Sequence, residues 1–194
     1  MTNFRTDLAS TTPPEWADYI LENFDEFLID HANCERKASA LAMSFVVKYA
    51  DRPQIIPPLI DLAQEELEHF RQIYVLMEKR GLRIMADIKD PYVNALLEGC
   101  RSGKEDRFMD RLLVSSLVET RGAERFRLIH QALEDAELKE LYRDLWACEA
   151  KHGNLFVQLA MQCFPEDEVK TRLADLAQME AAVVAGLKWR PSLH

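Results

Sequence analysis

The sequence predicts an all-α fold built on four long helices. Only six of the 194 residues are glycine, and the apolar/polar alternation that is typical of β-strands is scarce. Long stretches instead carry apolar residues three and four positions apart, which places these residues on one face of a helix. In addition, the pattern Glu-x-x-His occurs at Glu66–His69 and again at Glu149–His152. Residues three apart lie one turn apart on the same helical face.

The composition is that of a globular protein, with 48% hydrophobic and 29% charged residues. We expect a single domain over residues 1–194. The N-terminal residues lack a signal-peptide core, and no apolar run approaches membrane-spanning length, so a cytoplasmic location without membrane contact is expected. The four cysteines form no C-x-x-C pair, which argues against a rubredoxin-type iron site or a zinc ribbon. A net charge of −9 argues against a generally basic nucleic-acid-binding protein, but it leaves room for a local basic patch.

The first half of the chain divides into an irregular arm, a short helix and two long helices. Residues 1–13 form the arm, and Pro14 suits the first turn of the short helix. Apolar periodicity predicts a long helix over residues 24–50, which Asp51-Arg52-Pro53 ends. A second long helix is predicted from Pro57-Pro58 to Arg80, with Gly81 as its terminator.

The second half repeats this arrangement after a long connection. We expect residues 82–104 to form the crossover of a four-helix bundle, with a short helix from Pro91 through Leu97. The remaining predicted elements are two long helices, one peripheral helix and a tail, at residues 105–133, 136–163, 166–187 and 188–194 respectively. The predicted architecture is therefore a four-helix bundle with one long crossover and extra peripheral helices.

Six residues of this bundle form a repeated pattern of metal ligands. Each Glu-x-x-His pair follows another glutamate by one helical hairpin: 66 − 35 is 31 residues, and 149 − 119 is 30 residues. Each of these glutamates lies on an apolar stripe, where an unpaired carboxylate would be destabilising. Four glutamates and two histidines on four helices are the donor set of ferritin-like di-iron and di-manganese proteins. The predicted catalytic and metal-binding residues are Glu35, Glu66, His69, Glu119, Glu149 and His152.

The chemistry of this donor set favours iron or manganese over zinc, which prefers tetrahedral sites with fewer ligands. In the predicted site Glu66 and Glu149 bridge two ions. Each ion also takes one glutamate and one histidine, Glu35 with His69 or Glu119 with His152. The alternative is that each glutamate faces solvent. Two interpretations are open for His31, one turn before Glu35: a hydrogen-bonded core histidine or a seventh ligand.

The residues around the ligands resemble those of one particular family. The stretches HANCERKASALAMSF, DLAQEELEHFRQIYVLMEKRG and VETRGAERF look like those of the tRNA-(2-methylthio-N6-isopentenyladenosine) hydroxylases, and the resemblance extends from about Trp16 to Phe164. It implies a ferritin-like non-haem di-iron monooxygenase that uses O₂ to hydroxylate the isopentenyl group of this nucleoside in tRNA. The implied cofactor is a pair of iron ions, and the implied partners are tRNA and an electron-donating reductase system.

Other functions remain open at the sequence level. One is a different small di-iron hydroxylase, such as the quinone-biosynthesis type, and another is a ferritin-like ferroxidase or iron-binding protein. A third is a helical interaction module without metal.

A tRNA substrate requires a basic surface, and three clusters of basic residues are candidates. We favour the cluster in and after the crossover, because an irregular loop can follow a phosphate backbone. The favoured cluster is Arg101, Lys104 and Arg107; the alternatives are Lys79, Arg80 and Arg83, and Arg121, Arg125 and Arg127.

Overall fold

The computed structural model describes residues 6–86 and 88–194, and all regular elements in this part are helical. The chain divides into two compact units, which are described separately below. One unit contains Tyr19–Ile88 and Arg190–Leu193, and the other contains Met1–Asp18, Lys89–Trp189 and His194. The short helix α1 (Glu15–Glu22) runs across the boundary between them. That the whole chain is a single domain remains a prediction.

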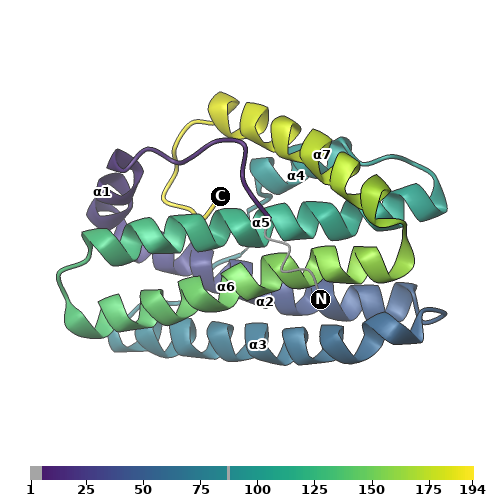
Figure 1. The fold of residues 1–194 in the computed structure, drawn as a ribbon. Coiled ribbons are helices and arrows are strands. Elements are labelled where there is room, and N and C mark those ends of the chain that lie inside the picture. The colour runs from purple at the N-terminus through teal and green to yellow at the C-terminus, as the bar shows by residue number, and fades with distance from the viewer. Residues whose placement is uncertain (1–5, 87) are drawn as a thin grey trace. The chain divides into compact units, whose positions relative to one another are not determined.

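The Tyr19–Ile88 unit is an antiparallel helical hairpin. Helix α2 (Phe24–Lys48) and helix α3 (Ile56–Lys79) lie side by side, joined by the short 3₁₀ turn η1 (Pro53–Ile55) (Figure 1). Large apolar side chains on both helices are fully buried, among them Phe27, Phe45, Leu59 and Ile73. Burial of this much apolar surface is the main source of the stability of such a pair.

Two polar contacts and a glycine complete this hairpin. The Ser39 hydroxyl of α2 donates a hydrogen bond to the Ala63 carbonyl of α3 at 2.8 Å. At the end of α3, Gly81 adopts a left-handed φ of 72°, and the amide of Leu82 bonds back to the Met77 carbonyl at 2.9 Å. This is the helix-ending motif that glycine makes possible, as the sequence predicted.

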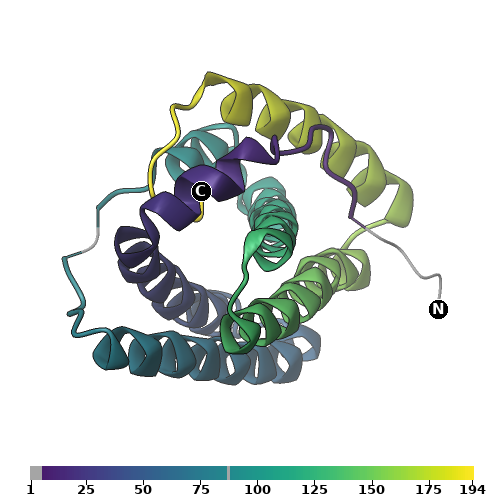
Figure 2. The ribbon, with the colours of Figure 1, turned by 90° about the vertical axis from the view of Figure 1, so that its left-hand side faces the viewer.

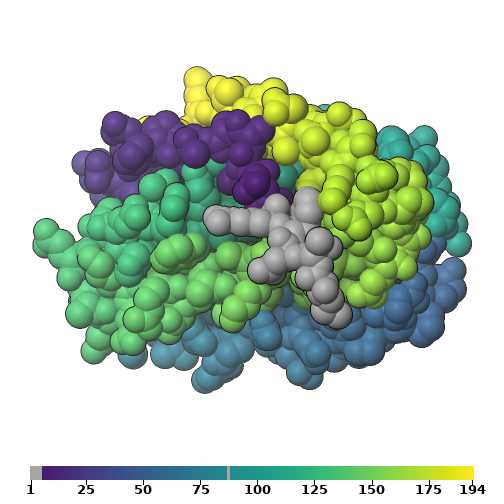
Figure 3. Space-filling model, viewed as in Figure 1, coloured from purple at the N-terminus to yellow at the C-terminus, as the bar shows by residue number. Residues whose placement is uncertain are grey.

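The second unit contains four helices. They are α4 (Pro91–Glu98), α5 (Lys104–Ala132), α6 (Ala136–Cys163) and α7 (Glu166–Gly186). Helices α5 and α6 form a long antiparallel pair, and α7 packs on α4 and α5 at the outside of this pair (Figures 1 and 2). The outer sides of α6 and α7 form part of the surface seen in Figure 3.

The starts of two of these helices are fixed by aspartate caps. The Asp90 side chain accepts a hydrogen bond from the Tyr92 amide at 2.8 Å, just before Pro91 opens α4. The Asp135 side chain accepts one from the Leu138 amide at 2.9 Å and starts α6. Such caps satisfy amide groups that have no partner inside the helix. Asp135 lies in the short turn between α5 and α6.

Helices α5 and α6 approach closely at Gly153, the residue after the predicted ligand His152. A Cβ atom on Gly153 would lie 2.5 Å from the Thr120 hydroxyl oxygen and 3.2 Å from the Ser116 carbonyl oxygen. The Ser116 hydroxyl donates to the Gly153 carbonyl at 2.7 Å. The Thr6 hydroxyl of the N-terminal arm hydrogen-bonds Ser116 at 2.9 Å, so the arm is attached at the same place.

The helix boundaries agree with the predicted ones to within one or two residues in most cases. One detail differs. Helix α3 begins at Ile56, ahead of the two prolines, because proline is compatible with the first turn of a helix. On α3 the apolar residue Ile60 is 38% exposed, whereas Leu59 and Leu62 are buried. No helix within residues 6–86 and 88–194 is long and apolar enough to cross a membrane.

Candidate metal centre

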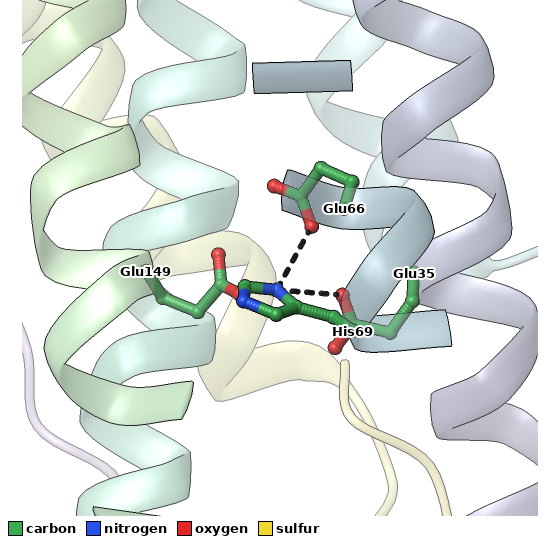
Figure 4. Close-up of side chains that lie close together, drawn as sticks. All are labelled: Glu35, Glu66, His69 and Glu149. Carbon is green, nitrogen blue, oxygen red and sulfur yellow. Dashed lines mark ion pairs between the residues drawn. The ribbon is translucent and has the colours of Figure 1, made fainter. Parts of the chain in front are cut away.

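Three of the predicted ligands converge inside the α2–α3 hairpin. Glu35 projects from α2, while Glu66 and His69 project from consecutive turns of α3 (Figure 4). His69 Nδ1 lies 3.6 Å from Glu35 Oε2 and 3.4 Å from Glu66 Oε2. One ligand atom from each residue lies within 4.8 Å of the others. Their exposed fractions are only 3%, 1% and 6%, so these donors are withdrawn from solvent.

The α5–α6 hairpin contains a second triad of the same composition. Glu119 projects from α5, and Glu149 and His152 project from consecutive turns of α6. His152 Nδ1 lies 3.2 Å from Glu149 Oε2. Ligand atoms of these three residues also lie within 4.8 Å of one another. Glu149 and His152 are buried, whereas Glu119 is half-buried.

Each hairpin thus carries one glutamate on its first helix and a Glu-x-x-His pair on its second. Two buried carboxylates and one imidazole per hairpin suit an iron or manganese ion better than zinc. In the absence of a cation, carboxylates held this close in a low-dielectric interior would repel one another. The donor set therefore fits a carboxylate-rich metal centre, and the alternative in which every glutamate faces solvent is excluded for Glu35, Glu66 and Glu149.

Comparison with known proteins identifies the family. A family model described as "tRNA-(MS[2]IO[6]A)-hydroxylase (MiaE)" matches residues 1–194. The chain belongs to this family.

Two relatives and one solved structure support the assignment to the MiaE family. The tRNA 2-(methylsulfanyl)-N(6)-isopentenyladenosine(37) hydroxylase of Pseudomonas putida is 33% identical over 175 residues, which cover 89% of this chain and 85% of that protein. The protein of the same name from Salmonella typhimurium is 28% identical over 131 residues, 68% of this chain and 48% of that one. The solved "Protein 43 with aldehyde deformylating oxygenase activity from Synechococcus" is 36% identical, with a TM-score of 0.92 over 98% of this chain and 96% of that one. The predicted family and the all-α ferritin-like fold class are both confirmed.

His31 has a defined contact in this MiaE-family chain. Its Nε2 atom lies 2.6 Å from Glu35 Oε1, and the His31 side chain is fully buried. Of the two interpretations open from the sequence, the hydrogen-bonded core histidine agrees with this contact. Glu65, which directly precedes the predicted ligand Glu66, is exposed.

The residues of the favoured basic cluster differ in their surroundings, because Arg101 is bonded to a buried aspartate and Lys104 is exposed. Arg101 donates to the buried Asp110 of α5 through its main-chain amide and two side-chain nitrogens, with the shortest distance 2.8 Å, and Arg172 of α7 donates to the same carboxylate at 2.8 Å. Burial by itself raises the pKa of Asp110, but the hydrogen bonds from Arg172 and Arg101 outweigh it and hold this pKa at about 2. Lys104 is exposed and Arg107 is half-buried.

The alternative cluster on α5 is not a surface patch. Arg121 is fully buried and Arg125 is 6% exposed. Arg121 binds Glu180 of α7 at 2.8 Å and Glu124 at 3.0 Å. Burial, with a smaller contribution from the neighbouring Arg121, lowers the pKa of Arg125 to about 10. Arg121 and Arg125 are therefore not available to tRNA, because their side chains fill the interior of the unit, and only the third member of the cluster, Arg127, is exposed.

The buried carboxylate of Asp110 and its partners Arg101 and Arg172 were not predicted from the sequence. Asp110 is 0% exposed and lies between Met109 and Leu112 on the buried side of α5. An acidic residue within an apolar stripe was the signal that identified Glu35, and the same signal was present here. The partners Arg101 and Arg172 lie nine residues before and 62 residues after Asp110, so no local pattern pointed to them.

Proposed function

We propose that this chain is an O₂-dependent di-iron monooxygenase that hydroxylates the isopentenyl group of 2-methylthio-N6-isopentenyladenosine in tRNA. The observation that carries the proposal is the pair of identical Glu and Glu-x-x-His triads, each converging within its own hairpin. Membership of the MiaE family supplies the substrate and the reaction.

In this proposal the two triads together hold two iron ions. Glu35, Glu66 and His69 of one hairpin and Glu119, Glu149 and His152 of the other would hold these ions. Four carboxylates balance the four positive charges of two Fe²⁺ ions. A bound di-iron centre supplies the activation of O₂ for insertion of one oxygen atom into an unactivated C–H bond.

The protein residues position the donors and exclude water. The ligands sit on rigid helices, where Glu and His one turn apart point the same way. Phe27, Phe45 and Phe126 are at most 1% exposed on the ligand-bearing helices, while Phe70, next to His69, is half-buried. A dry apolar surrounding suits an isoprenoid group and protects an oxidising centre from solvent.

The tRNA contacts that we propose include Lys104 and Arg107 at the start of α5. Arg101 belongs to the same cluster, but its contacts with Asp110 make it a support of the loop as well as a phosphate ligand. The reaction also requires electrons, which a reductase system would supply. These proposed partners are consistent with a cytoplasmic location.

The experiment that tests the proposal compares iron-loaded wild type with ligand variants on tRNA that carries the unhydroxylated nucleoside. We expect wild type, given a reductant and O₂, to convert the nucleoside to its hydroxylated form. Glu66→Ala and His152→Ala should lose iron and activity together, whereas the exposed neighbour change Glu65→Ala should retain both. Oxidation of Fe²⁺ by wild type without any change in tRNA would instead favour a ferroxidase.

A further inference from the structure

The carboxylate of Glu35, one of the proposed ligands, is hydrogen-bonded to the buried side chain of His31. Both residues lie on α2, four positions apart, and are therefore one turn apart on one helical face. The distance from His31 Nε2 to Glu35 Oε1 is 2.6 Å, and the exposed fractions are 0% and 3%. A buried hydrogen bond to a carboxylate at this distance is short and charge-assisted. The Phe27 ring, with its centre 5.6 Å from that of His31, packs on the imidazole.

The two oxygens of Glu35 therefore have different surroundings. Oε1 accepts the hydrogen bond of His31, and Oε2 lies 3.6 Å from His69 Nδ1, on the side of the triad. Figure 4 shows the Glu35 carboxylate directed toward His69 and Glu66. Oε1 is thus engaged by His31, and Oε2 is the Glu35 oxygen that lies on the side of the triad. His31 itself is not one of the residues whose ligand atoms converge within 4.8 Å in the described part of the chain.

The second hairpin lacks this arrangement. The position four residues before Glu119 is Ser115, and its hydroxyl donates to the Arg111 carbonyl of its own helix at 2.9 Å. The repeated ligand pattern of the two hairpins is therefore broken at this position. Glu35 is buried while Glu119 is half-buried, which is a second difference between the two otherwise matched carboxylates.

We propose that His31 is a positioning residue that makes Glu35 a ligand through one oxygen only and makes the two metal positions inequivalent. This inference rests on the proposed di-iron function. The contact fits a proton on His31 Nε2, which donates to Glu35 Oε1. The metal position that contains Glu35 and His69 is then the more rigid and is filled first. Partners that orient a metal ligand in this way typically change metal affinity by about 10- to 100-fold when removed.

The first test is anaerobic titration of the metal-free full chain with Co²⁺ alone, followed by visible absorption. Wild type should bind two ions in two distinguishable steps. His31→Leu removes the donor and should weaken the first step by about 10- to 100-fold and change its spectrum. His31→Gln places an amide N–H near the position of Nε2 and should restore most of the affinity and the spectrum. The matched control is His130→Gln, because His130 bonds the Lys139 carbonyl away from the ligands; it should titrate like wild type.

Each outcome of the titration decides a different claim. Wild type that binds no Co²⁺ would overturn the proposed function and this inference with it. Two steps in wild type and the same two steps in His31→Leu would overturn the positioning role alone. Equal weakening in His31→Leu and His31→Gln would also overturn it, because the hydrogen bond would then not be what matters.

A second measurement needs no variant and remains decisive if His31→Leu does not fold. A ¹H–¹⁵N correlation spectrum of the Zn²⁺-loaded wild type reports which histidine nitrogens carry protons and which bind metal. We expect Nε2 of His31 to carry a proton, and His69 and His152 each to show a metal-bound nitrogen. A metal-bound nitrogen on His31 would make it a seventh ligand and would overturn the inference.

Discussion

Replacing Asp110 with asparagine tests the ion pairs that this buried carboxylate forms with Arg101 and Arg172 in the second unit. The folded-state pKa of about 2 lies below the ordinary value of 3.8, and this difference corresponds to about 2.5 kcal/mol of stability. Because the Arg101 side chain is 36% exposed, solvent screening reduces the expected value to about 2 kcal/mol. For a chain of this length, that loss lowers the Tm by about 4–8 °C at pH 7.

The stability difference between wild type and Asp110→Asn should decrease as the pH falls. A carboxyl whose pKa is lowered by folding stabilises the native state above its unfolded pKa, and this contribution is lost as the pH falls through the folded pKa. The stability advantage of wild type over Asp110→Asn should therefore be complete at pH 7, fall by about half at pH 3 and approach zero toward pH 2.

Chemical and thermal unfolding followed by circular dichroism at pH 7, 5 and 3 measures this difference. The control is Asp144→Asn on α6, because Asp144 is 66% exposed and its contact with Arg143 is at the surface; its Tm should change by less than about 2 °C. The reasoning is refuted if Asp110→Asn melts like wild type at pH 7, or if the difference between the two proteins is the same at pH 7 and pH 3.

Three further predictions concern packing, a second ion pair and metal binding. Gly153→Ala should destabilise by about 1–3 kcal/mol, because the new methyl group would lie 2.5 Å from the Thr120 hydroxyl; Gly186→Ala, with nothing within 4 Å, is its control in denaturant titrations. Glu180→Gln should lower the free energy of unfolding by about 3 kcal/mol, since it leaves the buried Arg121 short of a counter-charge; an unchanged denaturation midpoint would contradict this. Fe²⁺ or Mn²⁺ should raise the Tm of the metal-free protein in a concentration-dependent way, and a Glu66→Ala variant that gains the same increase would argue against the ligand assignment.

The fold could be predicted because its signals are local. Apolar periodicity placed the long helices, and prolines and Gly81 marked their ends. Helix α3 starts one residue before the predicted Pro57, since two prolines are compatible with more than one first turn. The exposure of Ile60 could not be read from the sequence, because adjacent apolar residues on one helix give no information about which of them faces the partner helix.

The convergence of the candidate ligands within each hairpin was predictable for a related reason. Each contains a Glu-x-x-His pair, whose geometry is fixed within one helix, and the second hairpin repeats the first. Contacts between distant segments were not predictable. Arg121 and Arg125 look like surface charges in the sequence, and only the packing of α7 and the N-terminal arm against α5 reveals that they are buried. His31 and Ser115 occupy matching positions, four residues before Glu35 and Glu119. The consequence of this difference could not be predicted without the hydrogen bond between His31 and Glu35.

The most direct test of the central claim is a reaction with isotopically labelled O₂. Iron-loaded protein, reductant and tRNA that carries 2-methylthio-N6-isopentenyladenosine are mixed under the labelled gas, and the nucleosides are analysed by mass spectrometry. The account predicts a hydroxylated nucleoside with one labelled oxygen atom, in an amount that follows the iron content and disappears in Glu66→Ala. Unmodified nucleoside in the presence of fully iron-loaded protein, or a hydroxyl oxygen that derives from water, would contradict it.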